Sequence, residues 1–175
     1  PTPYGPAWLL IERGIASFAH PNAYLAGVLF RVSCVVGVAL LAACIPALAA
    51  RHGVDPATAT WLGVLNPLIL MHFVSGAHND ALMVGLLAAA FWLATCNRCL
   101  WAAVLVGGAI AIKPIAVLAL PFIGLQWAGP GAGWGARIRA WLLATLAAGC
   151  ALACLFLVAD AGTGLLSAAF GTPSG

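Results

Sequence analysis

Charged side chains are scarce in this sequence. Seven Lys and Arg and four Asp and Glu make up 6% of its 175 residues, whereas a soluble domain carries about 25%. So few charges cannot cover the surface of a chain of this size in water. The sequence also has no basic stripe of the kind that binds nucleic acid. A soluble globular domain and a nucleic-acid-binding module are therefore excluded.

Several signatures of soluble enzymes and secreted proteins are also missing. The chain has no glycine-rich nucleotide loop, zinc signature or nucleophile elbow, so chemistry on a cytosolic nucleotide is unsupported. It opens at Pro1 without Met and without a charged leader, so we do not read a signal peptide and expect a piece of a longer protein. Cys96 and Cys99 form a C-x-x-C pair with no second pair and no neighbouring His. We interpret them as helix-end cysteines.

Apolar side chains dominate what remains. The chain is 64% hydrophobic, with a mean hydropathy of +1.08. Its long apolar runs lack the alternation of strands, and a helix satisfies its own backbone groups in lipid. We therefore predict an all-α fold: a polytopic transmembrane helix bundle of about five or six spans, with broken helices. We expect one domain over residues 1–175 in a multi-pass plasma-membrane protein.

Polar and Pro-containing breaks divide the chain into segments. Residues 1–22 are predicted to form an external loop and an interfacial helix with Trp8 at the headgroups. Residues 23–160 carry the spans and residues 161–175 form an external tail. Asp55 reads as a helix cap before Pro56. The expected helices are Ala7–Ala19, Ala23–Ala50, Ala57–Val74 with a kink at Pro67, Ala81–Thr95, Leu100–Ile112, Ile115–Trp127 and Ala140–Ala159.

The stretch from Leu100 to Trp127 has two interpretations: one broken span, or two short helices that meet at Lys113-Pro114. Lys and Arg collect in cytoplasmic loops, which we use to orient the chain. If the chain turns at Lys113, the cytoplasmic side receives Arg51, Arg98, Arg137 and Arg139. The outer side then receives Glu12, Asp80 and Asp160. A single span would move the last two arginines and Asp160 to the opposite sides.

Ionisable residues inside apolar spans are costly and mark candidate sites. His78, Asn79 and Asp80 form one cluster, which could bind sugar hydroxyls or a divalent metal, with Asp80 as a candidate base. The alternative is helix capping by Asn79 or Asp80. Capping needs only one of these residues, and His72 extends the polar patch by a further turn or so. We therefore expect the cluster to bind substrate.

Three other residues are candidates for substrate binding. Lys113, between two apolar stretches, either holds a phosphate in a cavity or snorkels to the headgroups. Arg31 has the same alternatives, and Arg31 or Arg13 could also pair with Glu12. Tyr4, in a Tyr-Gly-Pro sequence, belongs either to a site or to a turn. We expect Lys113 to share one polar cavity near the outer face with the His78 cluster.

Six stretches, in the same order along the chain, resemble one family. They are Pro3–Pro6, Leu65–Leu68, Gly76–Gly85, Ala111–Pro114, Ala119–Pro121 and Gly171–Pro173. The Gly-Ala-His-Asn-Asp-Ala-Leu block within the third is the most specific. This pattern resembles the polyprenol-phosphomannose-dependent α-1,6-mannosyltransferases of mycobacteria and their relatives, which are multi-span glycosyltransferases of the C type.

The resemblance implies a reaction and its partners. Mannose would pass from a polyprenyl-phosphate donor to a lipid-anchored lipomannan or lipoarabinomannan core on the outer face of the plasma membrane. The family's catalytic acidic residue lies in a first external loop, which would precede Pro1, so we expect it outside this chain. The rival hypotheses are a transporter with a His78, Asp80 and Lys113 relay, and an assembly subunit whose polar residues only cap helices.

Overall fold

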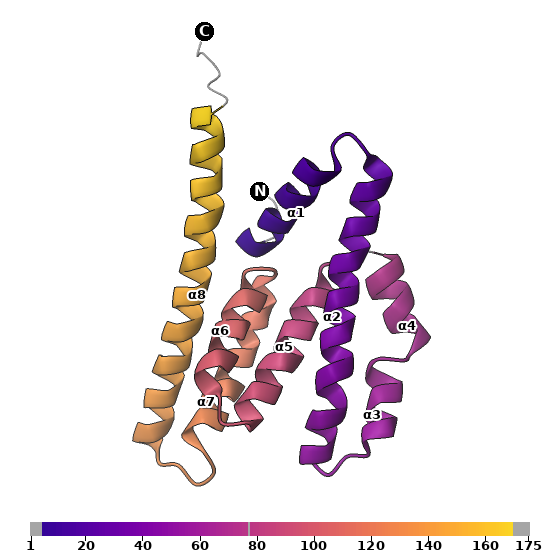
Figure 1. Cartoon of the computed structure of the whole chain (residues 1–175). Coiled ribbons are helices and arrows are strands. Elements are labelled where there is room, and N and C mark those ends of the chain that lie inside the picture. The colour runs from indigo at the N-terminus through magenta and orange to yellow at the C-terminus, as the bar shows by residue number, and fades with distance from the viewer. Residues whose placement is uncertain (1–4, 77, 170–175) are drawn as a thin grey trace.

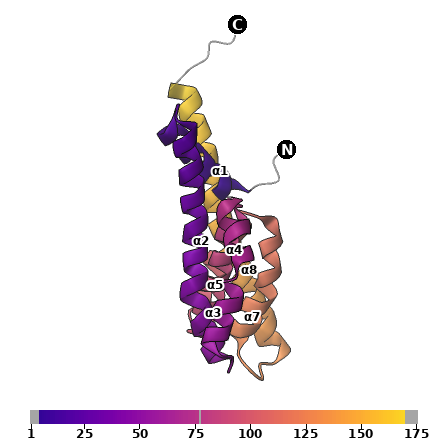
Figure 2. The same cartoon turned by 90° about the vertical axis from the view of Figure 1, so that its right-hand side faces the viewer.

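The computed structural model describes residues 5–76 and 78–169, and every regular element within them is helical. Two long helices, α2 (Ala23–Arg51) and α8 (Trp134–Ala169), flank three shorter ones (Figure 1). The shorter helices are α5 (Asp80–Thr95), α6 (Cys99–Ile110) and α7 (Leu120–Ala128). Figure 2 shows α2 and α8 extending beyond the shorter helices at the same end. The predicted all-α class is confirmed for the described residues.

Two of these helices are long and apolar enough to cross a membrane. They are α2, with 29 residues, and the first 26 residues of α8, Trp134–Ala159. Each contains an 18-residue window with a mean hydropathy of 2.5. At 1.5 Å per residue α2 is about 43 Å long, more than the roughly 30 Å of a hydrocarbon core. The other apolar helices are shorter: Asp80–Thr95, Cys99–Ile110 and Pro114–Ala128. These features indicate a membrane protein, and the number of spans stays a prediction.

The predicted helix over Ala57–Val74 is wrong as one continuous element. The structure has α3 (Pro56–Gly63), an irregular stretch, α4 (Pro67–Ile69) and a π-helical segment, η1 (Leu70–Ser75). Pro67 therefore begins a helix instead of kinking one. The Asn66 side chain accepts a hydrogen bond from the Leu68 amide at 3.0 Å. Asn followed by Pro is thus a helix-start signal here.

The predicted cap at Asp55 is confirmed. The Asp55 carboxylate accepts hydrogen bonds from the Thr58 hydroxyl at 2.6 Å and the Thr58 amide at 2.8 Å. Pro56 occupies the first turn of α3, where its missing N–H costs nothing. The hydrogen bonds from the Thr58 side chain and backbone lower the pKa of Asp55, because they stabilise its ionised form.

The two interpretations of Leu100–Trp127 are resolved in favour of two elements. Helix α6 ends at Ile110, and a 3₁₀ segment, η2 (Pro114–Ala119), leads into α7. Lys113 is extended, with φ −142° and ψ 126°, because the residue before a proline disfavours the helical region. The chain reverses at this point, so α6 and α7 run side by side and both reach the far end of the bundle (Figure 1).

With the chain reversed at Lys113, polar residues gather at two opposite ends of the bundle. Arg51 ends α2, Arg98 precedes α6, and Arg137 lies in the first turns of α8; we call this the arginine end. Its parts are in contact, because Arg51 donates a hydrogen bond to the Thr95 carbonyl. His78, Asn79, Asp80 and Lys113 lie at the opposite end of the short helices, which we call the motif end.

Helix α1 (Pro6–Ala19) lies across the motif end, beyond the ends of α5 and α6 (Figure 1). Backbone N–H groups of Gly5 and Ala7 donate to the carbonyls of Ile112 and Ala111 at 3.1 and 2.9 Å. These bonds hold the start of α1 against the 111–113 turn. Trp8, expected at the headgroups, is 4% exposed and packs on Met83, Ala109, Ile112 and Ala116. Its ring therefore faces the bundle, and its depth in the membrane stays a prediction.

Several helix boundaries also differ from the prediction, and α8 begins at Trp134 and not at the expected Ala140. Helix α5 begins at Asp80, and the Asn79 side chain makes no capping hydrogen bond. Helix α8 continues to Ala169, so the tail predicted from residue 161 is helical as far as the structure describes it. Gly162 and Gly164 each cost only about 1 kcal/mol in a helix, and no proline removes a backbone donor between 160 and 169.

Candidate functional site

A close crossing of α2 and α5 positions the polar motif. A Cβ atom on Gly37 would lie 2.3 Å from the Ala81 carbonyl oxygen, and one on Gly85 would lie 2.4 Å from the Gly37 carbonyl oxygen. Only glycine permits this approach, as in other helix pairs that pack through small residues in lipid. The first turn of α5 is therefore held directly against α2. The thiol of Cys34, one turn earlier in α2, contacts the His78 carbonyl at 3.4 Å.

The π-helical segment η1 leads into this motif. Its His72 ring stacks on the His78 ring, with centroids 4.9 Å apart and planes inclined by 16°. Short π-helical segments occur frequently at functional sites. Gly76 lies in the same turn, where a Cβ atom would come within 2.6 Å of the His72 carbonyl oxygen. The sequence therefore needs glycine at this position to bring the two histidines together.

Asp80 and Lys113 form an ion pair. The Lys113 Nζ atom lies 2.5 Å from the Asp80 Oδ1 atom, and the side chains are 31% and 26% exposed. Asp80 lies in the first turn of α5, where the helix dipole favours a negative charge. Two residues 33 positions apart thus meet because the 111–113 turn and the start of α5 lie at the same level. The sequence predicted that both residues share one polar cavity, but it did not predict their contact.

A cavity of about 390 Å³ lies beside this pair. Its walls come from α1, α2, the end of η1 and the residues that precede α5. They contain a carboxylate, a guanidinium, an imidazole, an amide and two aromatic rings. The lining residues are Trp8, Glu12, Gly27, Phe30, Arg31, Ser75, Gly76, His78 and Asn79.

The predicted single cavity for the whole cluster is therefore only partly observed. His78, Asn79 and Arg31 line it, whereas Asp80 and Lys113 pair with each other and are not among its walls. Sequence analysis missed Trp8, Glu12 and Phe30 as lining residues. The one available signal was Glu12, which lies beside Arg13 in a mainly apolar segment.

Asn79 is the buried polar residue of this region. It is 4% exposed, and its Nδ2 atom has no hydrogen-bond partner among the described residues. An unsatisfied buried donor costs about 1–3 kcal/mol, so such groups call for an explanation. Because Asn79 makes no capping bond to α5, the capping alternative does not account for its presence.

The remaining candidates lie as follows. Arg31 bonds the Gly27 carbonyl of its own helix at 3.2 Å, and Arg13 bonds the Ala159 carbonyl of α8 at 2.9 Å. Pairing of either arginine with Glu12 is not seen among the described side chains. Tyr4 lies outside the described residues. Within the described part of the chain, no three His, Cys, Asp or Glu side chains gather as metal ligands would.

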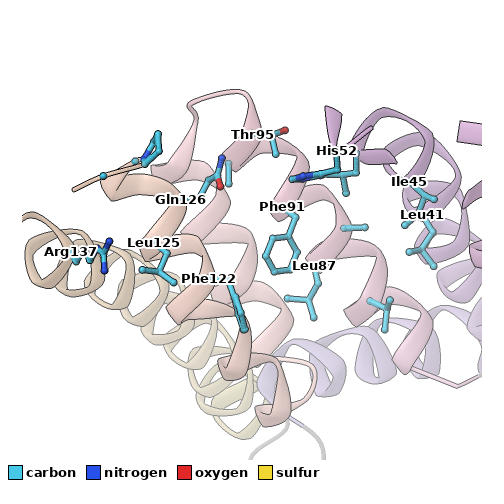
Figure 3. Close-up of a pocket in the computed structure, with 17 residues that line it drawn as sticks. Leu41, Ile45, His52, Leu87, Phe91, Thr95, Phe122, Leu125, Gln126 and Arg137 are labelled. Atoms are coloured by element: carbon cyan, nitrogen blue, oxygen red, sulfur yellow. The ribbon is translucent and has the colours of Figure 1, made fainter. Parts of the chain in front are cut away.

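A larger cavity of about 1060 Å³ lies toward the arginine end, between α2, α5 and α7 (Figure 3). Leu41, Ile45, Leu87, Phe91 and Phe122 provide its apolar walls, and His52, Thr95, Gln126 and Arg137 also line it. It contains none of the motif residues. Its walls are mostly hydrocarbon.

The amino-acid sequence is similar to that of known proteins. A family model described as alpha-(1->6)-mannopyranosyltransferase, N-terminal domain, matches residues 1–129. The chain belongs to this family. The resemblance read from the sequence motifs is therefore confirmed.

Individual relatives support the same assignment. The chain is 39% identical over 125 residues to alpha-(1->6)-mannopyranosyltransferase A of Mycobacterium tuberculosis, covering 71% of this chain and 24% of the relative. It is 36% identical over 128 residues to the Corynebacterium glutamicum protein of that name, covering 73% and 26%. A third relative, alpha-(1->6)-mannopyranosyltransferase B of C. glutamicum, is 36% identical over 88 residues, covering 50% and 14%. The chain thus spans about a quarter of the length of the first two relatives. No solved structure matches it.

Proposed function

We propose that the full-length protein transfers mannose from a polyprenyl-phosphate donor to a lipid-anchored glycan of the lipomannan or lipoarabinomannan type. The reaction would take place on the outer face of the plasma membrane. Family membership and the relatives' names support the sugar and the linkage. The observation that carries the proposal is the gathering of charged and polar side chains at one end of an apolar bundle.

The position of these side chains suits a lipid-phosphate donor. Arg31 precedes Arg51 by 20 residues in α2, which corresponds to about 30 Å along the helix axis. This equals the roughly 30 Å thickness of the hydrocarbon core. With the arginine end in the cytoplasm, Arg31 and the motif end lie at the outer boundary, where a polyprenyl phosphate carries its charge.

In this arrangement the elements between α2 and α8 complete the membrane domain. The segment from α3 to η1, the helices α5 and α6, and the pair η2 and α7 would each cross the membrane once. Together with α2 and α8 they give six crossings, within the predicted range of five or six. Helix α1 would lie at the outer surface, over the motif end.

Lys113 is the cation proposed to hold the donor phosphate, and it is already in contact with Asp80. Arg31 reaches the motif end from α2 and is proposed to bind the uncharged part of the substrate. A phosphate could share the Lys113 ammonium group, which has three N–H donors. Asp80 is the candidate base within this chain, although we assign the principal catalytic carboxylate to a part of the protein outside it.

The proposal is tested by mannose transfer in membranes that contain the full-length protein. Radiolabelled mannose on a polyprenyl phosphate should pass to a glycan acceptor, and membranes without the protein are the control. The transporter with a His78, Asp80 and Lys113 relay is not favoured by the comparisons. Movement of a solute across sealed vesicles, together with no transfer from any polyprenyl-phosphate donor, would establish the rival and reject the proposal.

A further inference from the structure

The cavity beside the Asp80–Lys113 pair has a wall chemistry of its own. Glu12 and Arg31 bring opposite formal charges to it, and these two charges cancel. A phosphate would meet the Glu12 carboxylate as well as the Arg31 guanidinium, so the cavity does not favour an anion. A neutral ligand with many hydroxyls can instead donate to Glu12 and accept from Arg31.

Apolar groups complete this cavity. Trp8 and Phe30 belong to its walls, and their rings lie 5.9 Å apart at 35°. Aromatic side chains offer an apolar surface that suits the C–H face of a pyranose. At about 390 Å³, the cavity falls at the lower end of the range of about 300–1,000 Å³ typical of small-ligand sites. Its size therefore matches a sugar unit and not a long chain.

The unpartnered Nδ2 atom of Asn79 points to the same class of ligand. A donor that is buried and unsatisfied without ligand becomes satisfied when a hydroxyl oxygen accepts its hydrogen. Ser75 and His78 lie on the same wall and can bond neighbouring hydroxyls. The cavity thus combines balanced charges and aromatic surface, and one residue of its wall, Asn79, carries a buried free donor.

We infer that this cavity binds the pyranose ring of a neutral hexose, with Asn79, Glu12 and Arg31 as hydrogen-bonding groups. The identification of that hexose as mannose rests on the proposed function. The sugar site is separate from the Asp80–Lys113 pair, which we assign to the charged part of the donor. The ring belongs either to the donor sugar or to the terminal sugar of the acceptor glycan, since both present the same hydroxyls.

Direct binding tests the inference without relying on catalysis. Saturation-transfer NMR on the full-length protein in detergent would use methyl α-mannoside and an α-1,6-linked mannobioside, with inorganic phosphate as competitor. We expect both sugars to bind and phosphate not to displace them. Asn79→Leu should weaken binding about tenfold or more, because a sugar hydroxyl would then face a hydrocarbon group.

Two variants guard against a merely structural effect. Asn79→Leu removes an unsatisfied donor, so the midpoint temperature of unfolding should stay equal or rise while binding is lost. Asn79→Asp keeps the shape of the side chain but replaces the amide NH₂ donor with a carboxylate oxygen, which only accepts. This variant should therefore also lose binding. Gln126→Leu, which removes an amide from the cavity toward the arginine end, is the matched control and should leave binding unchanged.

The outcomes separate the alternatives. A higher KM for the glycan acceptor in Asn79→Asp assigns the ring to the acceptor, and a higher KM for the lipid donor assigns it to the donor. Sugar binding that is unchanged in both Asn79 variants, absent in the wild type, or displaced by phosphate overturns the inference. Binding that depends on Asn79 in a protein without transferase activity would retain the sugar site and reject the proposed function.

Discussion

The arginine end and the motif end of the bundle use their polar residues differently. At the arginine end, polar groups complete helix ends: Asp55 caps α3, Arg51 bonds the Thr95 carbonyl, and Arg137 lies 5.5 Å above the Trp134 ring. At the motif end, Asp80 pairs with Lys113 and Asn79 makes no capping bond. Capping thus accounts for Asp55 at the arginine end, whereas it does not account for Asn79 at the motif end.

The ends also differ in what covers them. Helix α1 closes the motif end and buries Trp8 there, whereas Trp134 at the arginine end is 70% exposed. A polar cluster under a cover can be kept from water, which strengthens its electrostatic interactions. The four predictions that follow test this contrast, from the largest expected effect to the smallest.

Replacing Trp8 by Ala should cause the largest loss. Truncation of a buried Trp typically costs about 3–5 kcal/mol, and Trp8 is packed on Met83, Ala109 and Ile112. Thermal unfolding of the full-length protein in detergent measures the effect. Trp134→Ala is the matched control: its exposed ring loses mainly a cation–π contact with Arg137, worth about 0.5–1 kcal/mol. Equal losses in the two variants would mean that α1 does not cover the motif end.

Lys113→Ala should slow mannose transfer by about tenfold to a hundredfold. A charge-assisted contact with a phosphate is worth roughly 1.5–3 kcal/mol, and each 1.4 kcal/mol corresponds to about a factor of ten. Lys113→Arg should keep part of the activity because the charge remains. The measurement is radiolabelled transfer from the lipid donor, at matched protein level.

The ion pair with Asp80 makes a second variant necessary. The double variant Lys113→Ala with Asp80→Asn is compared with Asp80→Asn alone. If Lys113 holds the phosphate, the double variant should be slower than Asp80→Asn. Equal rates in these two variants would mean that Lys113 serves only to neutralise Asp80 and would contradict the phosphate role.

Gly37→Leu should separate α2 from α5. Forcing a large side chain into a packed site typically costs about 1–3 kcal/mol, and here the added atoms meet the backbone of Ala81. The shift would also move the first turn of α5, so transfer should fall together with stability. Gly149→Leu in α8, where an added Cβ meets nothing within 4 Å, is the matched control. A Gly37→Leu protein that melts and transfers like this control would exclude the close crossing.

Much of this architecture could be predicted from the sequence because its signals are local. Long apolar runs predicted α2 and the 140–159 part of α8, Asp55-Pro56 marked the start of α3, and Lys113-Pro114 marked a break. The error at Pro67 arose because Asn66 and Pro67 form a start signal inside an apolar stretch that otherwise reads as continuous.

The site was less predictable because it depends on contacts between distant segments. The motif alone indicated His78, Asn79 and Asp80, but no local pattern reveals that α1 returns over them. The burial of Trp8 and the position of Glu12 follow from backbone bonds between residues 5–7 and 111–112, more than 100 positions apart. The pairing of Asp80 with Lys113 likewise depends on the relative lengths of α5 and α6.

The smallest effect is expected at Asp55, at the arginine end, where lowering the pH should weaken the cap of α3. Hydrogen bonds from Thr58 lower its pKa from the usual value of 3.8, so the folded state favours the carboxylate. At pH values above the pKa of Asp55 in the unfolded chain, the Asp55 carboxylate therefore stabilises α3. This stabilisation is lost as the pH falls through the lower pKa that Asp55 has in the folded protein. Amide hydrogen exchange in α3 should speed up, relative to α6, as the pH is lowered from about 6 to below the ordinary aspartate value.

Asp55→Asn isolates the charge in this comparison. The amide oxygen can still accept from the Thr58 N–H, so α3 should form, but its exchange relative to α6 should no longer depend on pH in this range. Helix α6 serves as the internal reference because no side chain caps its start. The same acid-induced change in wild type and Asp55→Asn would assign the effect to another group and remove Asp55 as the pH-dependent element of the arginine end.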